Sequence, residues 1–265
     1  MKSDKKTVEH FRGFSEIWHG GYFEGDPLDP MGPSKYRRLG YISLLHAVYQ
    51  VCIRPYIHPK TIALEIGPGR GAWTKGMLCA REVWCLDAKS RDDNRIDEYL
   101  GYPSNLVYHQ VHDFSCSMLP DDRFTYLFSF GCLCHVPWDG ICQYATNLYG
   151  KLKEGAEAFW MVADYEKRNE ISRNFYRYDV HFRTLPSRVF RVLEWWNRWD
   201  SGRYWGPDNE PPLDKESDAL QGNPGRWYHS GAARTAEMLR RIGYHVVSED
   251  IGLLPRDALL HFRKS

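Results

Sequence analysis

The sequence lacks the features that would assign it to a membrane, a nucleic acid or a metal. No uninterrupted apolar run in its 265 residues approaches the ~20 residues that a membrane-spanning helix needs. Lysine and arginine total 35 against 34 for aspartate and glutamate, so the formal charge of +1 favours neither nucleic acid nor an anionic membrane. The seven cysteines include no C-x-x-C pair, and we find no further ligands at the spacing of a zinc site. We therefore predict no bound metal.

Targeting signals and internal repeats are also missing. The N-terminus is charged, but no apolar core region follows it, unlike in a signal peptide. We expect a soluble, cytoplasmic protein in which cysteines such as Cys132 and Cys134 are small apolar core residues. The feature that is present in excess is aromatic, with ten tryptophans and 15% aromatic residues overall.

One stretch, Thr61–Asp87, organises the rest of the chain. A short apolar run, Ile62–Ile66, precedes three alternating glycines at Gly67, Gly69 and Gly71, and a second apolar run ends at Asp87. This order predicts a strand, a glycine turn, a helix and a second strand that ends in a carboxylate, which is half of an α/β nucleotide-binding fold. The spacing is G-x-G-x-G and not the G-x-G-x-x-G of dinucleotide binders.

The segment Leu64–Gly71, Leu-Glu-Ile-Gly-Pro-Gly-Arg-Gly, resembles the first motif of class I S-adenosylmethionine-dependent methyltransferases. The resemblance implies a Rossmann-like α/β fold with a seven-stranded, mostly parallel sheet and an antiparallel last strand. It implies S-adenosylmethionine (SAM) as the cofactor, with Asp87 on its ribose and Asp113 and Phe114 at its adenine. The expected cofactor-binding residues are Glu65, Gly67, Pro68, Gly69, Gly71, Asp87, Ala88, Asp113, Phe114, Ser129 and Gly131.

The resemblance covers residues 61–164 and 230–265, which we expect to form the SAM-binding core. Within the core we predict strands over 82–86, 105–111, 124–131, 158–163, 244–248 and 259–263. We also predict helices over 72–80, from Pro137 through Leu152 with a stop at Gly155, and over 232–242.

Two segments lie outside the resemblance. Residues 1–60 include a predicted helix, Tyr41–Tyr56, with Leu44 on its apolar face, which either covers the cofactor pocket as a lid or packs on the sheet edge. Residues 165–229 interleave arginine with aromatic residues. They form either part of an acceptor site, for a sugar or a phosphorylated substrate, or a helical subdomain with its own core. RNA binding is a third interpretation, which the net charge near zero disfavours.

Methyl transfer requires alignment and, for a hydroxyl acceptor, a base. His135 follows the fourth predicted strand and is the first candidate for the base, the alternative being an ordinary helix-start histidine bonded to backbone. Asp164, Tyr165 and His229 are expected near the acceptor because open α/β sheets place ligands at the carboxyl ends of their strands.

The sequence thus predicts a SAM-dependent methyltransferase, with O-methylation of a small or medium polar acceptor such as a sugar, glycan or phosphorylated metabolite. Alternatives are an N-methyltransferase, an NAD-dependent oxidoreductase and a non-catalytic SAM-fold binding module. The expected partner is the acceptor alone, with no membrane span and no nucleic acid, and the oligomeric state is left open.

Overall fold

The computed structural model describes residues 26–30, 43–167, 188–189, 192, 228–254 and 257–265. Most of the arginine–aromatic stretch within 165–229, and residues 1–25 and 31–42 of the N-terminal segment, therefore lie outside the described residues. None of the described helices is long and apolar enough to cross a membrane.

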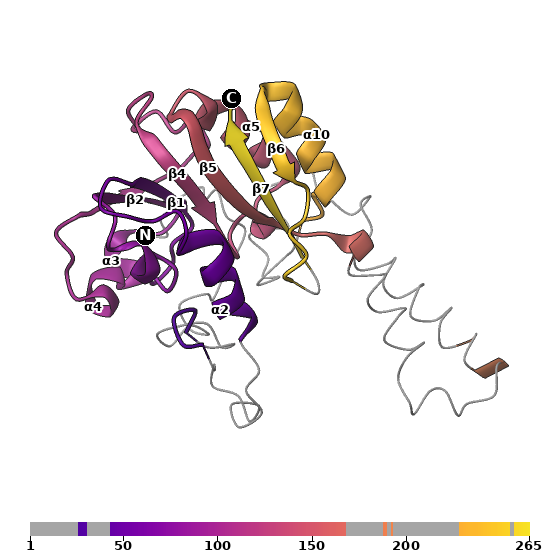
Figure 1. Ribbon diagram of the computed structural model, residues 1–265, viewed down its shortest axis with the longest axis horizontal. Coiled ribbons are helices and arrows are strands. Elements are labelled where there is room, and N and C mark those ends of the chain that lie inside the picture. The colour runs from indigo at the N-terminus through magenta and orange to yellow at the C-terminus, as the bar shows by residue number, and fades with distance from the viewer. Residues whose placement is uncertain (1–25, 31–42, 168–187, 190–191, 193–227, 255–256) are drawn as a thin grey trace, which may run out of the picture.

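A seven-stranded sheet forms the centre of the molecule, in the order β3-β2-β1-β4-β5-β7-β6 (Figure 1). Five strands pair in parallel, whereas β7 runs antiparallel to both of its neighbours, β5 and β6. This arrangement confirms the predicted fold class. The strands are β1 (Ile62–Ile66), β2 (Glu82–Asp87), β3 (Leu106–Gln110), β4 (Phe124–Ser129), β5 (Leu152–Val162), β6 (Tyr244–Ser248) and β7 (Ala258–Lys264).

Among the described residues, the helices around the sheet are short, except α5 and α10. They are α2 (Leu44–Val48), the π-helix η2 (Tyr49–Ile53), the 3₁₀ helix η3 (Thr74–Met77), α3 (Arg91–Asn94), α4 (Ile96–Leu100), the 3₁₀ helix η4 (Leu133–His135), α5 (Trp138–Tyr149) and α10 (Ala232–Ile242).

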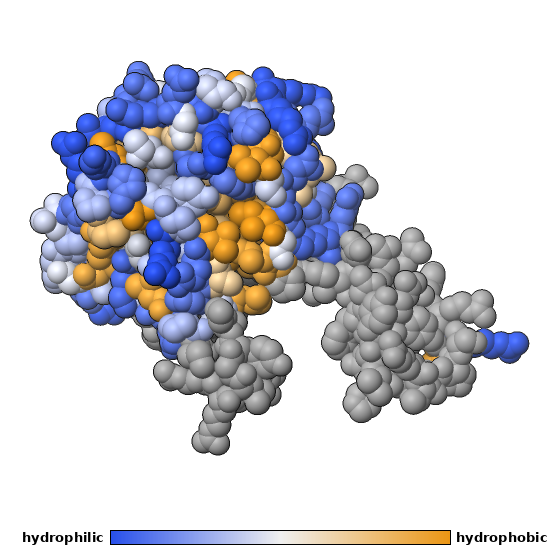
Figure 2. All heavy atoms as spheres, in the orientation of Figure 1, coloured by the Kyte–Doolittle hydropathy of each residue, from blue (hydrophilic) through white to orange (hydrophobic). Residues whose placement is uncertain are grey.

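Apolar side chains are buried on both faces of the sheet. Alternate residues of β1 point to opposite faces, so Leu64 joins one core with α5 and α10, while Ala63 joins the other with α2 and η2. Every residue of β1 is buried, as expected for a central parallel strand covered on both sides. The face of the molecule in Figure 2 is correspondingly mostly hydrophilic, with a hydrophobic patch between α2 and β7.

The predicted crossover helix over 72–80 is wrong, because this segment forms only η3 flanked by turns. Gly76 has a poor intrinsic preference for a helix. A Cβ at this glycine would lie 3.0 Å from Cε2 of Tyr49 and 3.3 Å from Cδ2 of Leu28. The segment therefore packs closely under η2 and the N-terminal residues, and this tertiary contact decides its local form.

The predicted end of the helix after β4 is also wrong. α5 ends at Tyr149 with Gly150 as its C-cap, and Leu152 already begins β5. Gly155 stops no helix: it lies within β5 at a φ of +75°, where the pairing with β4 shifts register between Phe124 and Tyr126. A bulge uses a glycine for the same reason as a helix end, because both require a positive φ. Gly155 therefore indicated an irregular backbone position, but not that this position lies within a strand.

The predicted N-terminal helix is shorter than expected. α2 and η2 together cover residues 44–53, and their buried side chains include Leu45, Val48 and Cys52. Leu44 is 50% exposed and does not belong to the buried face.

Candidate functional site

The site lies where the strand order reverses, between β1 and β4. In open α/β sheets this reversal leaves a crevice at the carboxyl ends of the strands, because the following connections turn to opposite faces. β1 leads there into the glycine loop, and β4 leads into Gly131, whose φ is +70°. The Ser129 hydroxyl donates to the Ile66 carbonyl over 3.0 Å and so joins the two strand ends.

All three glycines of the loop adopt positive φ, at +70° for Gly67, +53° for Gly69 and +93° for Gly71. The Gly67 amide donates to the Leu86 carbonyl over 2.8 Å, and the Gly71 amide donates to Pro68 over 2.8 Å, which closes a turn. A Cβ on Gly71 would lie 3.0 Å from Ile96 and from Leu100. This third glycine therefore allows α4 to approach the loop, a packing role that the sequence pattern does not reveal.

Asp87, at the end of β2, holds the glycine loop in place. Its Oδ2 accepts from the Gly69 amide over 3.1 Å, and its Oδ1 accepts from the Lys89 amide over 2.8 Å. The side chain is buried, and this burial raises the pKa of Asp87, while the two amide donors oppose the shift. A carboxylate can accept further bonds beside these two, so a diol could still bind to it.

A polar network behind Asp87 was missed from the sequence. The side chain of Asn94 hydrogen-bonds to Asp87 and also donates to the Tyr108 hydroxyl over 2.8 Å. That hydroxyl donates to the Lys89 carbonyl over 2.8 Å. Asn94 and Tyr108 come from α3 and β3, and no motif links them to Asp87. Nearby, the side chain of Gln110 donates to the carbonyl of Ala88, another predicted cofactor residue, over 3.0 Å.

Glu65 lies within β1 and is almost fully buried, with 1% of its surface exposed. The Thr74 hydroxyl donates to its Oε2 over 2.6 Å, and the Cys85 thiol lies 3.9 Å from the same oxygen. Burial raises the pKa of Glu65 to about 8, and the nearby Asp87 adds to this increase. Thr74 follows the glycine loop in sequence, but nothing in its type identified it as the partner of this acid.

After β3, Asp113 is exposed and Phe114 is buried. The Ser115 amide donates to Asp113 over 2.8 Å, and the hydrogen bonds from Ser115 hold the pKa of Asp113 below its usual range. Phe114 meets Tyr144 edge-on, with ring centroids 5.1 Å apart. Its ring also occupies the space where a Cβ of Gly140 would be, at 2.5 Å. Gly140 of α5 was not predicted as a site residue.

His135 ends η4, just after β4, and is buried. Its amide donates to the Cys132 carbonyl over 2.8 Å. The preceding carbonyl, of Cys134, accepts from the Tyr228 amide over 2.8 Å. Tyr228, near the end of residues 165–229, is therefore attached beside His135.

Asp164, Tyr165 and His229 come together at the end of β5, as their predicted grouping requires. The Tyr165 amide donates to Nδ1 of His229 over 3.0 Å, and the two rings stack with centroids 4.8 Å apart. Asp164 accepts from the Lys167 amide and from the Ala232 amide, each over 3.0 Å. It thus caps the start of α10, a structural task that sequence reasoning missed.

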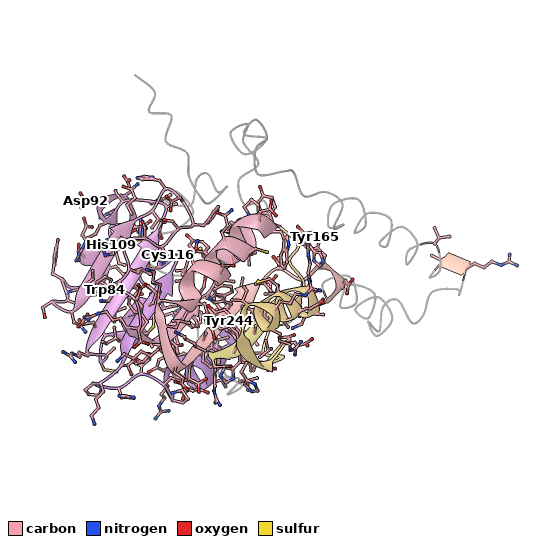
Figure 3. All side chains as sticks on the ribbon, turned by 90° about the horizontal axis from the view of Figure 1, so that it is seen from above. Trp84, Asp92, His109, Cys116, Tyr165 and Tyr244 are labelled. Atoms are coloured by element: carbon pink, nitrogen blue, oxygen red, sulfur yellow. The ribbon has the colours of Figure 1, made fainter. Side chains whose placement is uncertain are left out.

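The predicted residues thus form two groups along one edge of the sheet. The cofactor group, which comprises the eleven expected cofactor-binding residues, lies at the ends of β1, β2, β3 and β4. The acceptor group, which comprises His135, Asp164, Tyr165 and His229, follows β4 and β5 and adjoins α10. In Figure 3, Tyr165 lies at the opposite side of the sheet from Trp84 and His109, which belong to β2 and β3. Among the described residues, no group of three or more His, Cys, Asp or Glu side chains is arranged to hold a metal ion.

No protein-family model matches the sequence, and a search of curated proteins found no match. Solved structures do resemble the chain. A SAM-dependent methyltransferase from Mesorhizobium loti is 16% identical, with a TM-score of 0.53 over 83% of this chain and 97% of that chain. The N-methyltransferase NodS from Bradyrhizobium japonicum WM9, in complex with S-adenosylhomocysteine, is 13% identical, with a TM-score of 0.51 over 90% of this chain and 94% of that chain.

A putative SAM-dependent methyltransferase from Listeria monocytogenes is similar to the same extent, with 12% identity and a TM-score of 0.50 over 83% of this chain and 96% of that chain. At identities this low the likeness concerns the fold. The sheet order, the antiparallel β7 and these neighbours agree, and the chain has the fold of class I SAM-dependent methyltransferases.

Proposed function

We propose that the protein is a SAM-dependent methyltransferase that acts on an oxygen of a small or medium polar acceptor. The observation that carries the proposal is the buried Asp87 carboxylate, which accepts from the Gly69 amide of the glycine loop at the point where the strand order reverses. An acid at the end of β2 suits a ribose diol, and the loop allows a ligand to approach the backbone closely.

The residues present fit this cofactor. Asp87 keeps acceptor capacity for the ribose, and Asp113 is exposed with its pKa held below the usual range, so its carboxylate is an acceptor for an amino group near pH 7. Phe114 offers an apolar surface beside it. Glu65 is buried and contacts Thr74, so we assign it to orienting the glycine loop rather than to proton transfer. SAM supplies a methyl group on a sulfonium, which is already a good leaving group.

The protein must then align the acceptor and remove its proton if the acceptor atom is a hydroxyl oxygen. We propose His135 for this base, because it follows β4 at the edge of the crevice. Tyr165 and His229 would contact the acceptor from the end of β5. A sugar, a glycan or a phosphorylated metabolite fits the arginine–aromatic composition of residues 165–229. We propose residues 165–229 as the acceptor-side segment and residues 1–60 as a lid.

Nitrogen remains the alternative acceptor atom, since the structurally similar NodS is an N-methyltransferase. The two cases differ in the need for a base, because a neutral amine needs no proton removed before it attacks. Transfer from tritiated SAM to a panel of sugars, phosphorylated metabolites and amines distinguishes them. Loss of turnover in His135→Ala with a hydroxyl acceptor would support the base, and retained turnover would remove His135 from that role.

The proposal predicts binding of SAM and S-adenosylhomocysteine, measurable by isothermal calorimetry. Asp87→Asn should weaken both at least about tenfold, because the amide that replaces one oxygen must oppose a backbone N–H of Gly69 or Lys89. Asp92→Asn, an exposed acid in α3, is the matched control and should bind normally.

Folded protein that binds neither compound would refute the proposal. A saturable change in NADH fluorescence on titration would instead indicate the oxidoreductase alternative, which the G-x-G-x-G spacing disfavours.

A further inference from the structure

Backbone hydrogen bonds hold the chain on both sides of His229. The residues on either side of it are bound to η4 and to the residue after β5: the Tyr228 amide donates to the Cys134 carbonyl over 2.8 Å, and the Ser230 and Gly231 amides donate to the Ala163 carbonyl over 3.1 Å each. The histidine is therefore fixed at the carboxyl edge of the sheet, between η4 and the end of β5.

Three contacts then fix its ring. Tyr165 stacks on it with an interplanar angle of 30°, and the Tyr165 amide donates to Nδ1. A Cβ at Gly231 would lie 3.2 Å from Cε1 and 3.4 Å from Nε2, so Gly231 packs closely against this part of the ring. The side chain is 7% exposed, and among the described residues Nε2 has no hydrogen-bond partner.

The bond from Tyr165 determines where the ring proton lies. A backbone amide can only donate, so Nδ1 must present its lone pair, and the proton of the neutral ring is then on Nε2. The charged groups that influence the ring are Asp164, Glu166 and Arg234. Burial lowers the pKa of His229 despite the two carboxylates, and Arg234 adds to the decrease, so the ring is neutral near pH 7.

We propose that His229 recognises the methyl acceptor by donating Nε2–H to one of its oxygen atoms, and that it does not accept the proton released in the reaction. To act as a base, Nε2 would need the lone pair, and the proton would then lie on Nδ1, against the Tyr165 amide. The inference rests on the proposed function, and it selects acceptors with a hydroxyl, carbonyl or carboxylate oxygen near the methylated atom.

Two substitutions separate this role from a structural one. Glutamine places an amide donor near the position of Nε2 but loses the acceptor for Tyr165. Asparagine keeps an acceptor near the position of Nδ1 but does not reach the acceptor molecule. With the first compound that takes tritium from SAM in the panel, His229→Asn should raise KM at least about tenfold, and more than His229→Gln does.

The tautomer can be read without any acceptor. Two-bond ¹⁵N–¹H correlation spectra of histidine-labelled protein, with His229 assigned from the His229→Gln variant, should show a proton on Nε2 alone between pH 6.5 and 8.5. A proton on Nδ1, a ring that titrates in this interval, or a larger loss in His229→Gln than in His229→Asn would overturn the inference. SAM binding by calorimetry tests the proposed function separately.

Discussion

Glu65 is a carboxyl group whose protonation is coupled to folding. Its pKa rises from an ordinary value of 4.5 to about 8 because burial penalises the charged form. Between these two values the folded state holds a proton that the unfolded state has lost. The free energy of unfolding therefore falls as pH rises through this interval, which is the opposite of the usual behaviour of a salt-bridged acid.

Glu65→Gln should flatten this dependence, since glutamine resembles the protonated acid and can still accept from Thr74. We expect wild-type protein to lose a few kcal/mol more than the variant between pH 5 and pH 8, at about 1.4 kcal/mol per unit of pKa. Urea unfolding at several pH values measures the difference. Glu154→Gln, at an exposed position, should follow the wild-type curve, and identical slopes in all three proteins would contradict the prediction.

Gly140 tests how closely α5 packs against the ring of Phe114, a predicted cofactor residue. Alanine is favoured over glycine within helices by about 1 kcal/mol, but a Cβ here would lie 2.5 Å from Phe114 and 2.8 Å from Val136. Gly140→Ala should therefore destabilise the protein by about 1–3 kcal/mol and weaken SAM binding. Gly150→Ala is the control, because a Cβ at this C-cap has nothing within 4 Å. Thermal unfolding and calorimetry compare the two, and equal stability would refute the clash.

At the scale of elements, Asp164 connects β5 to the start of α10. Its two oxygens accept from the amides of Lys167 and Ala232, which leaves fewer of the first N–H groups of α10 without a partner. The link holds the segment around His229 close to the sheet, because the Ser230 and Gly231 amides bond to the adjacent Ala163 carbonyl.

Asp164→Ala should cost about 1–2 kcal/mol of stability through the loss of this cap, and Asp164→Asn should cost less because one oxygen acceptor remains. Differential scanning calorimetry ranks the three proteins. Unchanged stability in both variants together with lost turnover would instead assign Asp164 to contact with the acceptor. Thr146→Ala, at an exposed position of α5, serves as a control for a lost hydroxyl of little structural consequence.

Elements were predictable where local pattern and tertiary environment agree. β1 is mostly apolar and fully buried, and α10 ends at Ile242 with Gly243, whose φ is +119°, as its C-cap. The prediction failed at residues 72–80, where Gly76 must fit against Tyr49 and Leu28, and at Gly155, where a bulge uses the same positive φ as a helix end. In both cases a contact distant in sequence determined the local structure.

For the whole molecule, the sheet order explains why residues far apart in sequence meet. The reversal between β1 and β4 places the glycine loop beside Ser129 and Gly131, and β2 and β3 add Asp87 and Asp113 on one side. β5 adds the acceptor group on the other side. The order of the motifs along the chain was therefore sufficient to expect this edge of the sheet as the site.

Short-range patterns of apolar residues, glycines and acids predicted the individual strands and the glycine loop, whereas the seven-stranded sheet and the candidate cofactor residues were implied by the resemblance to class I SAM-dependent methyltransferases. What these residues contact depends on the fold, because their partners are distant in sequence. The fold placed Gly71 against α4, enclosed Glu65 with Thr74, and bound Asp164 to the start of α10. It also set the tautomer of His229, since a ring proton is directed by a partner, Tyr165, that lies 64 positions away in sequence.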